Sequence, residues 1–404
     1  MSGNIAIIHG GGPTAVINAS LYGAIREARR HNGAGRVLGA LGGADGVLEE
    51  RFVDFSTIPE EQLSLLPSSP ASAIGTSRRE LGAEDYEKMV AVCVKHSISR
   101  VLFNGGNGSM DACGKLYRSA RDKGVAVVGI PKTIDNDIAV TDHCPGYGSA
   151  ARYQAQTLAE ICQDVRAMPI HVSIMEGLGR NVGWIVGASA LAKTDDPAVG
   201  PHLVYLPEKL FDEDEFLADV ERLHREHGGV VVAVSEGLKN LQGEPVAGFI
   251  FQSGRSRYPG DVGSYLAELV IRRLGIKARS EKPALAGRSS ISMQSPVDRD
   301  EAILAGEEAC RTAVEGESGI MIGFERLSSV PYRVKPIRIP IERVMLAERS
   351  MPESFFGAGG DGVSPEFIEW CRPLIGGDLR DFLWFDKDGA LPRIGPGSKR
   401  VYGK

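Results

Sequence analysis

Short apolar segments alternate with longer amphipathic segments along the first half of the chain. This pattern predicts strands at 4–9, 100–103 and 125–130 and helices at 18–31, 84–95 and 110–122. Strands that alternate with helices of ten or more residues are typical of βαβ units. We therefore expect a mostly parallel sheet that helices cover on both faces.

The same alternation continues in the second half and predicts a second α/β domain. The expected strands cover 171–175, 202–206 and 230–234, and the expected helices cover 183–192, 213–227, 260–274 and 299–314. Toward the end of the chain, Pro331, Pro340 and Pro352 predict irregular connections.

The length of 404 residues exceeds what one hydrophobic core usually supports. The expected fold class is α/β, with two Rossmann-like three-layer domains whose sheets are mostly parallel. We expect the first domain over 1–140, rejoined by part of 260–325, the second over 141–258, and an extension over 326–404 that packs on the domains.

Composition excludes several classes of function. A formal net charge of -6 argues against a nucleic-acid partner, because such proteins concentrate Lys and Arg. No apolar run reaches the roughly 20 residues that span a bilayer, so no membrane association is expected. The first residues lack a secretory pattern, which predicts a cytoplasmic setting. The six cysteines form no CxxC pair and indicate reduced, structural thiols.

Two glycine-rich loops follow predicted strands. Gly10–Pro13 and Asn104–Ser109 each lie between a strand and a helix, where backbone N–H groups and the helix dipole favour an anion. Either loop alone could be a tight turn that needs glycine. Two such loops at one sheet edge favour a phosphate site. Asn107 offers an oxygen to a magnesium ion or, alternatively, caps the helix.

A third loop carries the densest chemistry of the chain. Lys132–Asp137 places a cation, a hydroxyl and two carboxylates directly after the predicted strand 125–130. A carboxylate can accept the proton of an attacking hydroxyl, and a cation can offset charge on a moving phosphoryl group. The loop could also be a turn rich in Asp and Asn. Together the three loops predict phosphoryl transfer.

Four segments resemble the phosphofructokinase family, especially its pyrophosphate-dependent branches. They are 11–18, 105–111, 131–137 and 141–150, and matching segments run from near residue 5 to about 325. The resemblance implies a phosphofructokinase fold with a donor-binding first domain and a sugar-phosphate-binding second domain. It also implies Mg²⁺-dependent transfer from pyrophosphate to the 1-hydroxyl of fructose 6-phosphate in glycolysis, by a homodimer or homotetramer.

The resemblance assigns roles in the donor site. Asp135 matches the general base, and Thr133 and Asp137 match residues that hold the transferred group and the metal. Lys132 and Arg78 match residues that contact phosphate. The matching donor-binding positions are Gly11, Gly12, Gly106, Gly108 and Ser109, and Asn107 matches a metal-coordinating position.

The resemblance also assigns the acceptor site. Thr133 and Asp135 face the sugar as well as the donor. Further matching positions are Leu178, Gly179, Arg180 and Glu236, together with Arg279 and Arg288 at the sugar's 6-phosphate. His171 occupies a position where some relatives present an Arg across a subunit boundary. Leu178 and the segment 285–287 depart from the family pattern, which leaves another phosphorylated ketose, such as sedoheptulose 7-phosphate, open as acceptor.

Two positions disagree about the donor. Lys132 is typical of pyrophosphate-dependent members, whereas Gly108 leaves room for the α-phosphate of ATP, which an Asp would repel. We favour pyrophosphate and keep an ATP-dependent kinase as the alternative. A regulatory homologue without activity is a further alternative. A dehydrogenase is a third, because Gly10, Gly12 and Ala15 fit a loose dinucleotide fingerprint.

Overall fold

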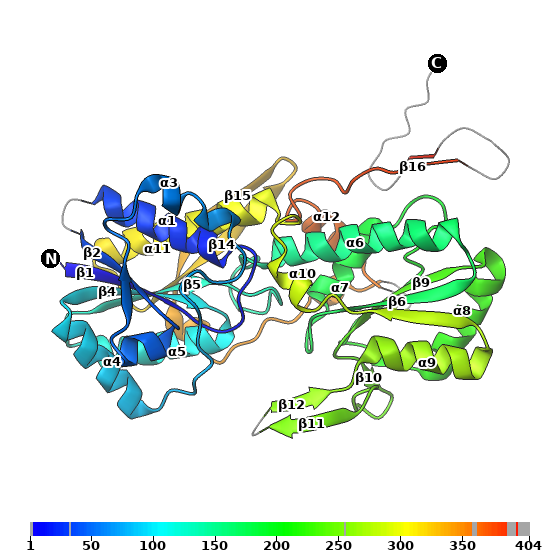
Figure 1. Ribbon diagram of the computed structural model, residues 1–404, viewed down its shortest axis with the longest axis horizontal. Helices are drawn as coiled ribbons and strands as arrows, with labels where there is room; N and C mark the ends of the chain where they lie inside the picture. The colour runs from blue at the N-terminus through cyan, green and yellow to red at the C-terminus, as the bar shows by residue number, and fades with distance from the viewer. Residues whose placement is uncertain (1–2, 32–33, 254–255, 358–361, 386–392, 395–404) are drawn as a thin grey trace, which may run out of the picture. The chain divides into compact units, whose positions relative to one another are not determined.

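The chain forms two compact units in a computed structural model (Figure 1), which describes residues 3–31, 34–253, 256–357, 362–385 and 393–394. Unit 1 comprises Met1–Ser149 and Arg288–Ser350, and unit 2 comprises Ala150–Gly287 and Met351–Lys404. The contacts thus divide 326–404 between the units, whereas the sequence predicted one extension. No helix in the described part of the chain is long and apolar enough to cross a membrane.

Unit 1 contains a seven-stranded sheet in the order β15-β14-β5-β4-β1-β2-β3. Its strands are β1 (Gly3–His9), β2 (Ala34–Ala40), β3 (Phe52–Asp54), β4 (Ile98–Gly105), β5 (Ala126–Pro131), β14 (Ile320–Ser329) and β15 (Tyr332–Pro340). The five central strands are parallel, and β3 and β15 run antiparallel at the two edges. The expected α/β class with a mostly parallel sheet is confirmed.

Helices cover both faces of this sheet, as Figure 1 shows. They are α1 (Ile17–Arg30), α2 (Ala44–Leu48), α3 (Glu60–Leu63), α4 (Ala83–Lys95), α5 (Asn107–Ala120) and α11 (Pro296–Val314). Because side chains alternate along a strand, β1 sends Ile5 and Ile7 to the core beneath α1 and α11, and Ala6 and Ile8 to the core beneath α4 and α5. This double burial explains why β1 is apolar throughout.

Helices α1 and α11 cross very closely. A Cβ atom at Gly23 would lie 2.1 Å from the Ile303 carbonyl oxygen, and one at Gly306 would lie 2.0 Å from the Ser20 carbonyl oxygen. Only glycine permits this approach of two backbones. The crossing therefore packs α11 against α1, although the two helices are far apart in the sequence.

Unit 2 contains a parallel four-stranded sheet in the order β13-β6-β9-β7. Its main elements are β6 (His171–Gly177), β7 (Leu203–Tyr205), β9 (Val230–Ser235), β13 (Lys277–Glu281), α6 (Tyr147–Ala167), α8 (Glu213–His227), α9 (Val262–Leu274) and α10 (Leu285–Ser289). Helices α8 and α9 share one core with the sheet, and α6 lies on the opposite face in Figure 1. The predicted helix over 183–192 is instead α7 (Trp184–Gly187) followed by a 3₁₀ helix, Ala188–Ala192.

Smaller elements complete unit 2. They are β8 (Leu210–Phe211), β10 (Lys239–Asn240), β11 (Phe249–Ser253), β12 (Ser256–Pro259), α12 (Pro365–Cys371), β16 (Leu383–Trp384) and β17 (Arg393–Ile394). Trp184 contacts Trp370 and Phe355, with ring centroids 4.8 and 5.8 Å apart. This aromatic cluster fastens α12 to the unit.

Candidate functional site

The three predicted loops lie together at one edge of the unit 1 sheet. They follow β1, β4 and β5, which are parallel neighbours, so their carboxyl ends meet. The amide of Lys132 donates to the Gly105 carbonyl oxygen over 3.0 Å, and that of Gly10 donates to the Asn104 carbonyl oxygen over 2.8 Å. A Cβ at Gly10 would lie 2.3 Å from Ser109 Oγ. The sequence prediction that these loops converge is therefore confirmed by their contacts.

The amino terminus of α5 points its amides into this edge. Gly106 is the N-cap, and Gly108 and Ser109 lie in the first turn, so the loop after β4 is shorter than predicted. A Cβ at Gly108 would meet nothing within 4 Å, and the residue is exposed. The Ser109 and Met110 amides donate to the Gly106 carbonyl oxygen, each over 2.9 Å, so the helix end offers an anion the amides before them and the free space beside Gly108.

The side chain of Lys132, from the third loop, is buried against the first loop. Its Nζ donates to the carbonyl oxygens of Gly10 and Gly12 over 3.2 and 2.5 Å, and its side chain is 3% exposed. Burial, together with the nearby charges of Arg288 and Arg78, lowers the pKa of Lys132 to about 8, against the opposing effect of Asp135. The lysine thus fixes the backbone of the loop and adds positive charge beneath it.

Two arginines complete a positive cluster at Gly12. A Cβ there would lie 3.0 Å from Arg288 Nη1 and 3.4 Å from Arg78 Nη2. Arg78 reaches this place because Gly11 donates to the Ser77 carbonyl oxygen over 3.1 Å. Burial and the charge of Arg78 lower the pKa of Arg288. Three cations that converge at Gly12 make a site for a polyanion.

The acidic loop is held in one conformation by its own hydrogen bonds. Thr133 Oγ1 donates to Asp137 Oδ1 and accepts from the Asp135 amide, both over 3.1 Å. Asn136 has a φ of +56°, and its Oδ1 accepts from the Cys144 amide over 3.0 Å. This left-handed residue turns the chain between the two aspartates, which therefore belong to one tight loop beside Lys132.

The residues fit a magnesium ion in part. Asn107 Oδ1 is buried and lacks a hydrogen-bond partner, while its Nδ2 donates to the Asp137 carbonyl oxygen over 3.3 Å. Within the described ranges, no three His, Cys, Asp or Glu side chains form a ready metal cluster. Mg²⁺ normally binds through one or two protein oxygens plus phosphates and water. An amide oxygen and a nearby carboxylate match that requirement.

Four of the eight residues predicted for the acceptor, Leu178, Gly179, Arg180 and Glu236, lie at the carboxyl ends of β6 and β9 in unit 2. The Glu236 amide donates to the Gly177 carbonyl oxygen over 3.1 Å, and Glu236 Oε1 accepts from the Gly179 amide over 3.4 Å. Arg180 Nε lies 3.9 Å from Glu236 Oε1. Gly179 has a φ of +123°, a conformation that glycine adopts readily.

Within unit 2, Arg279 lies apart from Gly177 and Glu236 at the ends of the strands. Arg279 pairs with Ser173 in the middle of β6, whereas Gly177 ends that strand. Burial, followed by the charge of Arg279, lowers the pKa of His171 at the start of β6, so Arg279 and His171 are neighbours. Arg288 belongs to unit 1 and contributes to the cluster at Gly12.

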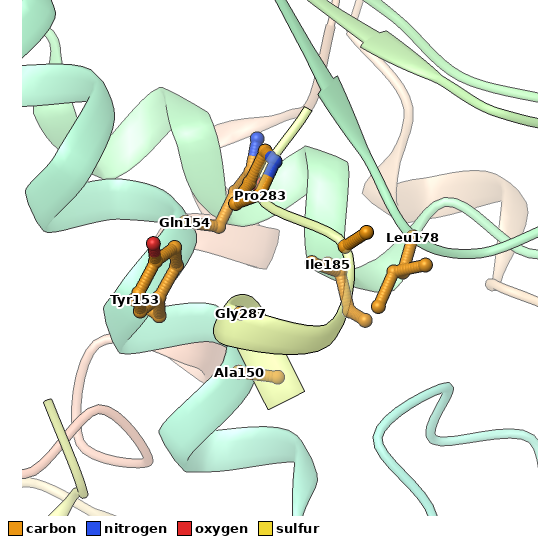
Figure 2. A pocket seen from close by; sticks show the side chains of 8 residues that line it. Ala150, Tyr153, Gln154, Leu178, Ile185, Pro283 and Gly287 are labelled. Carbon is orange, nitrogen blue, oxygen red and sulfur yellow. The ribbon is translucent and has the colours of Figure 1, made fainter. Parts of the chain in front are cut away.

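A small, mostly apolar pocket lies beside Leu178 in unit 2 (Figure 2). Its lining residues are Ala150, Tyr153, Gln154, Leu178, Ile185, Pro283, Ala284 and Gly287. Gln154 Nε2 donates to Ser189 Oγ over 3.0 Å, which holds one polar lining group in place. Of the lining residues, only Leu178 was predicted for the site; Ala150 and Gly287 lie in segments compared with the family but were given no role.

Sequence reasoning also missed the carboxylates that support the acidic loop from α11. Asp298 accepts from the amides of Gly146 and Ser149 over 2.8 and 2.9 Å. Burial raises its pKa to about 6, although these hydrogen bonds oppose the shift. No local signal marks this residue, because its partners lie about 150 positions away in the sequence.

Comparison with known proteins agrees with this geometry. The family model for phosphofructokinase matches residues 4–313. A pyrophosphate–fructose 6-phosphate 1-phosphotransferase from Xanthomonas campestris is 36% identical, over 97% of this chain and 95% of the relative. A sulfofructose kinase from Alkalicoccus urumqiensis is 31% identical, over 92% of this chain and 95% of the relative.

A solved structure is similar over nearly the whole chain. The crystal structure of a pyrophosphate-dependent phosphofructokinase from Marinobacter aquaeolei has a TM-score of 0.85 and 31% identity, and the match covers 97% of this chain and 95% of that chain. Its fold therefore includes both units described above, beyond the residues of the family model. The chain belongs to the phosphofructokinase family.

Proposed function

We propose that this protein transfers a phosphoryl group from pyrophosphate to the 1-hydroxyl of fructose 6-phosphate. The observation that carries the proposal is the convergence of Lys132, Arg78 and Arg288 on Gly12, beside the loop that contains Asp135. The names of the Xanthomonas relative and the Marinobacter structure support the same donor. We place the reaction in glycolysis and in the cytoplasm.

Asp135 is the proposed general base. It accepts the proton of the 1-hydroxyl as that oxygen attacks the terminal phosphorus of pyrophosphate. The bond between phosphorus and the bridging oxygen breaks, and the leaving phosphate retains the electron pair. Thr133 bonds to both the Asp135 amide and Asp137, so it fixes the spacing of the two carboxylates.

The cations and backbone amides stabilise the donor. We assign Arg78 and Arg288 to the oxygens of pyrophosphate, where a guanidinium can bind in a bidentate manner. Gly11 and Gly12 allow the backbone to approach the phosphates, and α5 adds its amides at Gly106 and Gly108. Ser109 adds its hydroxyl, since its amide donates to the Gly106 carbonyl oxygen over 2.9 Å. Arg288 lies in this cluster, which favours a donor role over the 6-phosphate role that the resemblance implied.

Phosphofructokinases generally use a divalent metal ion. We propose Mg²⁺, held by Asn107 Oδ1 and the Asp137 carboxylate together with phosphate oxygens. When bound, the ion neutralises charge on the phosphoryl oxygens. Asn107 also donates to the Asp137 carbonyl oxygen, so the protein aligns these two residues before any metal binds.

The acceptor is assigned to unit 2. We propose that Glu236, Gly179 and Arg180 bind sugar hydroxyls, with Leu178 beside them. Arg279 lies apart from these residues within one chain, beside the middle of β6, so it is proposed for the 6-phosphate of an acceptor bound to a second copy of the chain. Because it lies beside His171, a position implied at a subunit boundary, we further propose a homodimer or homotetramer. Light scattering of the purified protein tests the oligomeric state.

The donor assignment is tested with pyrophosphate and ATP as alternative donors to the wild type and to Gly108→Asp. We expect pyrophosphate-dependent turnover by the wild type. Any ATP activity should fall roughly tenfold or more in Gly108→Asp, since about 1.4 kcal/mol of repulsion at the α-phosphate suffices. The space around Gly108 and its place in the first turn of α5 let the variant fold.

Gly108→Ala is the matched control, because it adds a Cβ without a charge. Equal loss of ATP use in both variants contradicts the electrostatic account. Turnover with ATP but none with pyrophosphate overturns the proposed donor. Failure of the folded protein with every donor and acceptor favours the regulatory homologue.

The acceptor is tested with fructose 6-phosphate, sedoheptulose 7-phosphate and sulfofructose. The last is included because the pocket beside Leu178 is mostly apolar and a sulfofructose kinase is among the relatives. We expect the highest kcat/KM for fructose 6-phosphate. No activity on that sugar removes it as the acceptor while leaving phosphoryl transfer intact.

A further inference from the structure

A short segment after β15 lies against the acidic loop of unit 1. Glu348 forms an antiparallel bridge with Ile138, and the Arg349 amide donates to the Asp137 carbonyl oxygen over 2.7 Å. The segment belongs to unit 1 and lies beyond the residues matched by the family model, which end at 313. Residues distant in sequence therefore extend the backbone pairing of the loop that carries the aspartates.

The side chain of Arg349 binds the chain a few residues after Asp137. Its Nη1 donates to the carbonyl oxygen of Thr141 over 3.1 Å and also to that of Asp142. Burial lowers the pKa of Arg349, and the surrounding groups Cys144, Asp142 and Tyr147 oppose that shift. A guanidinium stays charged even so, and its fixed fork of donors can span two successive carbonyls.

These contacts lead directly to the reacting residues. The Asp137 carbonyl oxygen accepts from both Arg349 and Asn107, and the Asp137 carboxylate accepts from Thr133 Oγ1. Thr133 in turn bonds to the Asp135 amide. A shift of the backbone at Asp137 would therefore move both aspartates, because one hydroxyl links them.

We propose that Arg349 is a positioning residue, which holds the loop from Asp137 to Asp142 so that both aspartates keep their catalytic geometry. The inference rests on the proposed function for its kinetic part only. The contacts between Arg349 and the loop lie within unit 1, and their effect on the loop can be measured without substrate.

The first experiment is hydrogen exchange of peptides that cover 133–142 in the wild type, Arg349→Ala and Arg349→Lys. The control is Arg343→Ala, which removes an exposed arginine from the same segment. We expect faster exchange of the loop in Arg349→Ala and an intermediate rate in Arg349→Lys. If the loop exchanges at the same rate in Arg349→Ala as in Arg343→Ala, Arg349 does not hold the loop and the proposal is wrong.

The second experiment separates kcat from KM. In Arg349→Ala we expect kcat to fall roughly 10- to 100-fold, the effect of a small misplacement of reacting groups. KM for pyrophosphate should change by less than about threefold, since the lost contacts touch neither phosphate nor its ligands. Millimolar guanidinium should partly restore kcat in Arg349→Ala but not affect the control.

The outcomes keep the two proposals apart. A folded Arg349→Ala with kcat within about twofold of the wild type contradicts the positioning role. Faster exchange along the whole chain shows a general loss of stability and also contradicts it. An inactive wild type defeats the proposed function, whereas the exchange of 133–142 still decides whether Arg349 holds the loop.

Discussion

Lys132 performs two tasks in the candidate site. Its Nζ donates to two carbonyl oxygens of the first loop, so it shapes the backbone on which phosphate would rest. Burial, followed by the charges of Arg288 and Arg78, makes the protonated form costly before an anion arrives. A bound polyanion should reverse that cost and raise the pKa of Lys132.

This reversal predicts proton uptake when pyrophosphate binds near pH 8. The free lysine has a pKa of about 8, so it is partly deprotonated there, whereas the complex requires the cation. Affinity should therefore be greatest below pH 8 and decline as the pH rises above it. Calorimetry in buffers of different ionisation enthalpy measures the uptake.

Lys132→Gln is the reference, because pyrophosphate itself also titrates. The variant should bind more weakly and lose the part of the uptake that Lys132 contributes. An uptake identical in the wild type and in Lys132→Gln contradicts the assignment. The experiment needs no acceptor and no turnover.

Among the elements, β14, β15 and α11 support the acidic loop through a buried polar network. His143 Nε2 lies 2.7 Å from Glu301 and its Nδ1 lies 2.8 Å from Asp142. Tyr332 donates to Glu301 over 2.6 Å, and Arg326 lies 3.1 Å from Asp142. Burial alone would lower the pKa of His143, but the carboxylates of Glu301 and Asp142 outweigh it and raise the pKa to about 9.

The raised pKa predicts how stability depends on pH. Because the folded pKa of His143 exceeds its unfolded value near 6.5, its contribution is complete below pH 6.5 and is lost as the pH rises through about 9. The wild type should exceed His143→Gln by roughly 3 kcal/mol at pH 6, and by much less at pH 9.5. Urea unfolding across this range measures the difference, and a gap that widens with pH refutes the prediction.

The same elements show where sequence reasoning succeeds and fails. Strands β1, β4 and β5 were predicted because central parallel strands are apolar on both faces and read without ambiguity. Pro340 was expected in an irregular connection, yet it ends β15, which also contains Pro336. This strand lies at the edge of the sheet, where a missing N–H costs no ladder hydrogen bond.

The acidic loop was located from the sequence because its residues are contiguous. The distant residues that hold this loop in place were not located. The predicted chemistry of Lys132 and Asp135 depends on residue types within six positions. Arg349 and Glu301 lie more than 150 residues away and carry no motif. Their roles follow only from folding, which brings β14, β15 and α11 to the first sheet.

At the scale of the whole molecule, each unit is built from two separate parts of the chain. Residues 288–350 return to unit 1 because β14 pairs with β5, and 351–404 join unit 2 because Phe367 and Trp370 pack on Trp184. Local patterns carry no information about these pairings. Each unit nevertheless has its own hydrophobic core, which gives it a stability of its own.

Separate cores predict that unit 2 can be weakened without loss of anion binding in unit 1. Trp370 is 8% exposed within the aromatic cluster, so Trp370→Ala should destabilise unit 2 by about 3–5 kcal/mol. Phe385→Ala, at an aromatic residue that is 68% exposed, should change little. In calorimetric unfolding of Trp370→Ala, the melting temperature of unit 2 should be lowered. Pyrophosphate should still raise the melting temperature of unit 1. If Trp370→Ala abolishes pyrophosphate binding below its melting temperature, the polyanion site requires unit 2, and its assignment to Lys132, Arg78 and Arg288 alone is wrong.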